Sequence, residues 1–206
     1  MKMLKVGCAL LVGVGLLSAC GLVAKAIPPI ELANKNALNL KDEKIAVEFA
    51  ALPTLAKQDV NSSGQITATF GDAEKPDTKG FTPGAIDAAL KLVAVDVSGL
   101  TCNAPAAFDL KIEATGKVFE TGNPNIVADA SASTTVNITK TGEAYTLKSG
   151  SEIKMVFGSN LLNIVTSGGN NTAQVNYTVS STNDQLAGCR IEFTVGDQIV
   201  VLRDWH

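Results

Sequence analysis

Apolar and polar residues alternate with a period of two in many segments of this chain. In Asp109–Thr115, polar residues separate the apolar Leu110, Ile112 and Ala114. The same alternation runs through Thr172–Val179 and Cys189–Val195. It recurs more weakly in residues 44–49, 65–70, 92–97, 134–139, 145–148, 153–157 and 161–166. Successive side chains of a strand point to opposite faces, so the pattern predicts strands with one buried face, as in antiparallel sheets.

Strands of this number and length predict an all-β fold. We expect an antiparallel β-sandwich, immunoglobulin-like or related, with a closed β-barrel as the alternative. Turns are predicted at Gly116–Lys117, Thr141–Gly142 and Ser149–Gly150, and a two-residue hairpin at Gly196–Asp197. Residues 83–91, which follow Thr82 and begin with Pro83, favour one short helix about as strongly as an extended stretch.

The N-terminal residues have the pattern of a targeting segment. Two lysines precede an uncharged apolar stretch, residues 6–17, which is too short to cross ~30 Å of hydrocarbon as a helix. It ends in Leu17-Ser18-Ala19-Cys20. This arrangement is typical of a signal peptide, which we place at residues 1–19. An ordinary secretory signal with an incidental cysteine is the alternative.

The tetrad ending at Cys20 resembles the lipobox of bacterial lipoproteins. The resemblance implies cleavage before Cys20, a diacylglycerol thioether on its sulfur and an acyl group, such as palmitate, on its new amine. It also implies that Gly21, where aspartate would favour the inner membrane, directs the protein to the outer membrane if the organism has one. We expect residues 20–41 to be a tether, part of which could lie along the domain as an edge strand, and residues 42–206 to form a single β domain.

Two cysteines remain in the expected domain, Cys102 and Cys189. In an oxidising compartment such a pair predicts a disulfide, and two unpaired buried thiols are the alternative. A bond across this separation is worth ~4–5 kcal/mol in the chain-entropy model.

Charge and composition exclude several functions. The basic residues are nearly all lysine and the net charge is −3, so no nucleic-acid partner is expected. The single histidine, at the C-terminus, leaves no serine with an imidazole base, and Glu113 and Glu192 lie on polar strand faces. We therefore expect neither an enzyme nor a cofactor. Loops 71–77 and 123–129 offer oxygen ligands for calcium, but turn formation explains them equally well.

The sequence thus predicts a non-catalytic, lipid-anchored protein of the cell envelope, facing the periplasm or the exterior. Its β domain would serve envelope structure or interactions with other envelope proteins. One alternative is a carrier that holds a small hydrophobic ligand in a closed apolar cavity. Another is a surface adhesion or glycan-binding module, although aromatic residues are only 5% of the chain.

Overall fold

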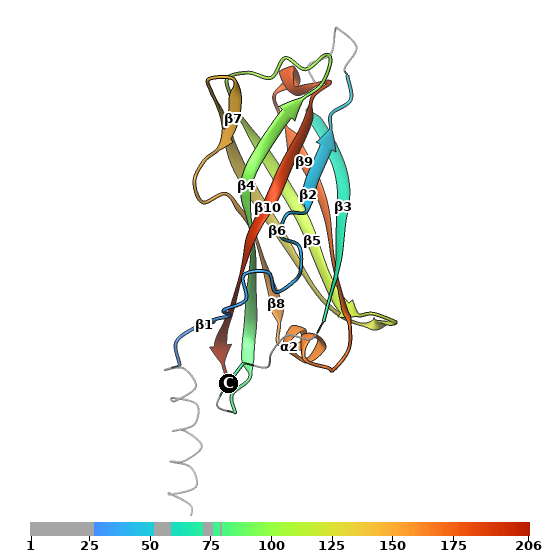
Figure 1. The fold of residues 1–206 in the computed structure, drawn as a ribbon, viewed down its shortest axis with the longest axis vertical. Coiled ribbons are helices and arrows are strands. Elements are labelled where there is room, and N and C mark those ends of the chain that lie inside the picture. The colour runs from blue at the N-terminus through green and yellow to red at the C-terminus, as the bar shows by residue number, and fades with distance from the viewer. Residues whose placement is uncertain (1–26, 52–58, 72–75, 79) are drawn as a thin grey trace, which may run out of the picture.

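The computed structural model describes residues 27–51, 59–71, 76–78 and 80–206, which form an antiparallel β-sandwich (Figure 1). One sheet, called here the β10 sheet, contains β1 (Ile30–Glu31), β2 (Lys44–Glu48), β10 (Arg190–Trp205), β4 (Pro83–Ser98) and β8 (Glu152–Gly158). The other, the β5 sheet, has the order β3 (Val60–Phe70), β9 (Asn171–Ser181), β5 (Ala107–Glu120), β6 (Asn123–Thr141) and β7 (Ala144–Leu147). The prediction of an all-β antiparallel sandwich is confirmed.

The alternation in the sequence decides which side chains enter the core. Along β5, every second residue from Phe108 to Val118 is buried, and the residues between them are exposed. Gly116 occupies one of these inward positions, so the predicted turn at Gly116–Lys117 is wrong. A Cβ at Gly116 would lie 2.5 Å from the sulfur of Met155 on the facing strand β8. Glycine is needed here for close packing between the sheets, not for a chain reversal.

The helix considered for residues 83–91 is a strand. This part of β4 pairs with β10 on one side and with β8 on the other, and these ladders outweigh its helix-forming alanines. A short helix occurs instead at α2 (Asn160–Val165), where a strand was predicted. Leu161, Ile164 and Val165 are its buried residues, at the spacing of one helical face. The chain also forms a 3-10 turn, η1 (Asp184–Leu186).

β10 continues through Gly196–Asp197 without a chain reversal, so the predicted hairpin there is wrong. Its register with β4 shifts on both sides of Val195, as in a β-bulge. A Cβ at Gly196 would meet the side chain of Val93 on β4 at 2.2 Å, so glycine leaves room for that side chain at the bulge. The turns predicted at Thr141–Gly142 and Ser149–Gly150 are confirmed, between β6 and β7 and between β7 and β8.

Residues 32–40, called here the strap, pack against the domain. β1 pairs with the C-terminal part of β10, and Leu38 and Leu40 are buried in the core. The buried Gln198 side chain holds the strap: its Oε1 accepts from the Leu38 N–H at 2.8 Å, and its Nε2 donates to Asn36 at 2.7 Å. The predicted tether is therefore wrong for residues 30–41, where the edge-strand alternative is closer, and the domain begins before residue 42.

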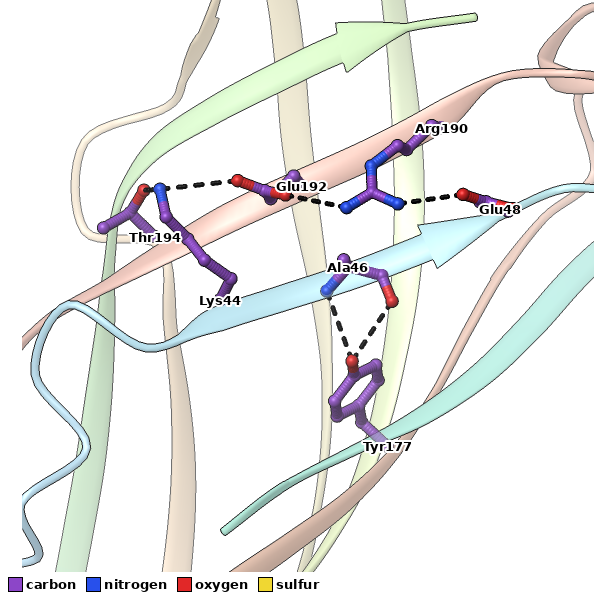
Figure 2. A network of polar contacts seen from close by, with 7 residues as sticks. All are labelled: Lys44, Ala46, Glu48, Tyr177, Arg190, Glu192 and Thr194. Carbon is purple, nitrogen blue, oxygen red and sulfur yellow. Dashed lines mark hydrogen bonds and ion pairs between the residues drawn. The ribbon is translucent and has the colours of Figure 1, made fainter. Parts of the chain in front are cut away.

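A tyrosine joins the two sheets beside β2. The Tyr177 hydroxyl, from β9, accepts from the Ala46 N–H at 3.2 Å and donates to the Ala46 carbonyl at 3.1 Å (Figure 2). It thereby satisfies backbone groups of the edge strand β2. Gly64 of β3 lies opposite Tyr177, and a Cβ there would stand 2.4 Å from the hydroxyl oxygen. Burial raises the pKa of the Tyr177 phenol, which stays protonated and able to donate.

Candidate interaction surface

A groove opens between the two sheets where β4 faces β7, and we call it the β4–β7 groove. It is lined by residues 91–95 and 145–152 and has a volume of about 670 Å³. β8 pairs with β4 only as far as Lys91, and the last backbone bond on this side runs from the Leu92 N–H to the Ser151 carbonyl at 2.9 Å. Before reaching β8, the chain leaves β7 of the opposite sheet through the turn at Ser149–Gly150. This change of sheet leaves the groove open.

Beyond Lys91, the edge of β4 lies next to β7 of the other sheet and forms no ladder with it. From Val93 to Ser98, no strand in the described residues pairs with β4 on the side away from β10. An unpaired edge offers free backbone donors and acceptors to any extended chain that lies beside it. Val93, at the bulge, is 59% exposed and is one of the few large hydrophobic residues so exposed. Val95 and Leu147 are half-buried in the groove lining.

Tyr145 is held firmly in the groove wall. Its hydroxyl donates to the Ala104 carbonyl at 2.8 Å, and its ring centroid lies 5.8 Å from that of Phe108. The Lys140 ammonium stands 5.6 Å from the ring centroid, within cation–π range. The groove therefore has one rigid aromatic side chain, which needs little ordering when a ligand binds.

The rim of the groove is positively charged. Lys91 and Lys148 line it, and Lys140 lies beside it on Tyr145, whereas Glu152 is the acidic residue in the lining. Among the described residues, no ion pair joins any of these three lysines to a carboxylate. Glu152 is the ladder partner of Lys91, so the lining itself has an excess of one positive charge, to which Lys140 adds a second from beside it.

A second hollow lies on the outer, polar face of the β5 sheet. It has a volume of about 610 Å³ and is lined mainly by hydroxyl, amide and carboxylate side chains. Gln65 donates to Asn176 at 2.6 Å, and Ser63 and Thr178 are hydrogen-bonded at 2.9 Å. These bonds run between neighbouring strands, so much of the polar capacity of this face is already used within the sheet.

The charged residues on the outer face of β2 and β10 neutralise one another. Arg190 donates to Glu48 at 2.8 Å and to Glu192 at 3.1 Å, and Lys44 lies 3.5 Å from Glu192 (Figure 2). The hydrogen bond from Arg190 lowers the pKa of Glu192. Glu113, the other carboxylate considered for catalysis, lies on the opposite sheet and pairs with Lys111. The two glutamates therefore cannot act together on one substrate.

The predicted disulfide is confirmed. Cys102 and Cys189 are bonded, with their Cα atoms 4.4 Å apart, and join the loop after β4 to the start of β10. The predicted lipidation site, Cys20, and the signal peptide lie outside the described residues. No helix in the part of the chain that the structure describes is long and apolar enough to span a membrane.

Neither predicted calcium loop gains support from the fold. Residues 72–75 of the first loop lie outside the described residues. The second, residues 123–129, is not a loop: it begins strand β6, where Asp129 is paired in register with Lys117. No cluster of three or more histidine, cysteine or acidic residues in the described ranges could hold a metal ion.

Comparisons with known proteins leave the chain without a family. No protein-family description and no curated protein matches it. Among solved structures it is similar to the xylan-binding module CBM15, with 14% identity and a TM-score of 0.26, over 85% of this chain and 96% of that one. It is also similar to a chain of infectious bursal disease virus, Gt strain, with 15% identity and a TM-score of 0.23 over 79% and 34% of the two chains. Scores this low carry no argument about function.

Proposed function

We propose that this chain is a lipid-anchored, non-catalytic binding domain of the bacterial cell envelope. In this proposal the β4–β7 groove binds an extended, acidic segment of another envelope protein. The observation that carries the proposal is the groove itself, in which an unpaired strand edge meets a positively charged rim.

The chemistry of the groove favours a polypeptide. An extended peptide can bond to the free backbone of β4 while alternate side chains contact Val95, Leu147 and Tyr145, as in strand addition. The lysines at the rim favour carboxylates on the side chains that point outward. The association should therefore weaken as salt rises, because exposed charges are screened.

The anchor rests on the Leu17–Cys20 tetrad, and the disulfide is consistent with an oxidising compartment. Several acyl chains on Cys20 would hold the protein at the membrane far more firmly than one chain could. Cys20→Ala should move the protein from the membrane fraction to the soluble fraction. A variant that still pellets with membranes and resists salt washing would contradict the anchor.

The observed packing gives the carrier alternative little support. Apolar side chains from both sheets fill the core. The apolar pocket between the strap, α2 and the strands beside them has a volume of about 30 Å³, the room of a single water molecule. A hydrophobic ligand would need a cavity of several hundred Å³.

Glycan binding is the second candidate, and the hollow on the β5 sheet favours it. Serine, threonine and asparagine side chains there could bond to sugar hydroxyls. Tyr177 is the one aromatic residue in the lining of this hollow, but it is buried and its hydroxyl is bonded to Ala46 of the other sheet, so it offers no ring surface on which a sugar could stack.

Peptide binding in solution tests the main proposal. The probe is a fluorescently labelled peptide in which glutamate and valine alternate. A second peptide, in which lysine replaces each glutamate, serves as its counterpart. Binding of both is measured by fluorescence anisotropy at low salt. We expect the acidic peptide to bind more tightly than the basic one. Val93→Glu and Lys148→Glu should each weaken binding of the acidic peptide. Val156→Glu and Lys117→Glu change exposed residues away from the groove and should leave binding unchanged. Equal binding of both peptides, or equal effects of all four substitutions, would overturn the groove as the site.

A further inference from the structure

One end of the sandwich gathers the N-terminal strand and two uncharged segments of the chain. β1, α2 and the hairpin that joins β5 to β6 all lie at this end, which we call the base, whereas β7 lies toward the opposite end (Figure 1). The Asn160 side chain of α2 donates to the Val127 carbonyl at 3.0 Å and so ties the helix to the hairpin. The first described residues are also fixed here, since the Trp205 indole donates to the Pro28 carbonyl at 3.2 Å.

The length of chain beyond the described residues limits how far the base can stand from an anchor at Cys20. Only seven residue steps separate Cys20 from Ile27. At ~3.5 Å per residue at most, Ile27 lies within about 25 Å of the anchored sulfur in any conformation of the intervening chain. The base is therefore the end of the molecule closest to the lipid.

Two segments of the base carry no charge, although the base also includes Glu31 of β1, and Glu120 at the end of β5 lies next to Gly169. Residues 121–128 of the hairpin and 158–171 around α2 contain no charged side chain, although the chain as a whole has 20 acidic residues. The hairpin tip carries Pro124, Asn125 and Ile126, which are all exposed, and Ile126 is 55% exposed. Uncharged amide and apolar side chains at an exposed tip suit the interfacial layer of a membrane.

We propose that the base lies on the lipid surface, with the tip of the β5–β6 hairpin in the headgroup layer around Ile126. The inference rests on the proposed anchor at Cys20. Contacts at both the anchor and the hairpin restrict rotation of the domain, so that the β4–β7 groove is held away from the membrane and open to partners.

Tryptophan quenching by brominated lipids tests this orientation. Asn125→Trp places a reporter at the hairpin tip, and Glu143→Trp places a matched reporter in the turn between β6 and β7. The buried Trp205 gives the same background in both variants and in the parent chain. The full chains are purified with their lipid and reconstituted into vesicles whose phosphatidylcholine acyl chains carry bromine.

We expect bromine to quench the added fluorescence at position 125 and not at position 143. Ile126→Asp, combined with Asn125→Trp, should abolish the quenching while the protein stays on the vesicles. Equal fluorescence with and without bromine at position 125, in protein that stays bound, would overturn the orientation.

A second arm separates this inference from the anchor. The same variants, beginning at Cys20, are coupled through that thiol to a maleimide lipid in the vesicles. If the full chains do not stay on vesicles, the natural anchor is wrong. Quenching at position 125 of the coupled chains then still supports the orientation of the base, and its absence contradicts it.

Discussion

Tyr177 and Gly64 form a pair in which each residue constrains the other. The Tyr177 hydroxyl reaches Ala46 only because Gly64 has no side chain. Gly64→Ala should lower the free energy of unfolding by ~1–3 kcal/mol, since the added methyl forces the ring away from β2. Gly71→Ala is the matched control, because a Cβ there has no neighbour within 4 Å. Urea unfolding that gives the same stability for both variants would contradict this role of Gly64.

The disulfide joins two cysteines that are 87 residues apart in the sequence, and it should stabilise the fold. Cys189→Ser should lower the free energy of unfolding by ~2–5 kcal/mol, chiefly by giving the unfolded chain more freedom. Reducing agent should lower the stability of the wild type similarly and leave the Cys102→Ser/Cys189→Ser double variant unchanged. A chain that begins at Gly21, denatured without reductant, should contain no free thiol; two reactive thiols would refute the bond.

Asp87 makes the stability of the β10 sheet depend on pH. It is buried between Arg203 Nε at 2.9 Å and Lys154 Nζ at 2.7 Å. Burial alone would raise the pKa of Asp87, but the hydrogen bonds from Lys154 and Arg203 outweigh it and hold the pKa below its ordinary value of 3.8. The ionised form therefore stabilises the fold above that ordinary value, and this contribution is lost as the pH falls through the lower, folded-state pKa.

We therefore expect Asp87→Asn to be less stable than the wild type at neutral pH and to lose less further stability on acidification below about pH 4. Asp96→Asn, at an exposed position on the same strand, should keep the wild-type acid dependence. Thermal unfolding measured from pH 7 to pH 2 makes the comparison. Parallel curves for Asp87→Asn and the wild type would contradict the assignment.

The Gln198 side chain of β10 adds to the backbone bonds that hold the strap on this strand. Gln198→Leu would leave the Leu38 N–H without its acceptor, at a cost of ~1–3 kcal/mol for an unsatisfied buried donor. We expect faster hydrogen exchange at Leu38 and a less stable domain. Gln185→Leu, at an exposed position, should change neither. Unchanged protection of Leu38 in Gln198→Leu would show that the strap is held by other contacts.

Strands were predictable where one face is buried and the other is in water. Residues 109–115 and 172–179 lie in β5 and β9, and residues 190–195 of the third predicted segment begin β10, because alternation in the sequence directly reflects those two faces. Residues 83–91 have a helical composition, and only pairing with neighbours on both sides, distant in sequence, makes them a strand. The i, i+3, i+4 spacing of Leu161, Ile164 and Val165 could have revealed α2 in advance.

The groove could not be predicted from the sequence, because it depends on how β7 of one sheet comes to lie beside β4 of the other. Val93 lies at a bulge that only the pairing of β4 with β10 reveals, and Tyr145 has the pattern of an ordinary strand residue. Lys91, Lys140 and Lys148 come together only in the folded sandwich. The disulfide was predictable, since it needed nothing more than an even pair of cysteines and an oxidising compartment.

For the molecule as a whole, we propose the β4–β7 groove as the binding surface. The most direct test is an NMR titration of the ¹⁵N-labelled chain from Gly21, first with the acidic alternating peptide and then with a neutral oligosaccharide. We expect the peptide to shift amide resonances of residues 91–98 and 145–152, with little change elsewhere. Peptide shifts centred on Ser63 and Thr178, in the hollow on the β5 sheet, would contradict the groove as the binding surface. So would an absence of peptide shifts at concentrations where the oligosaccharide shifts the resonances of that hollow.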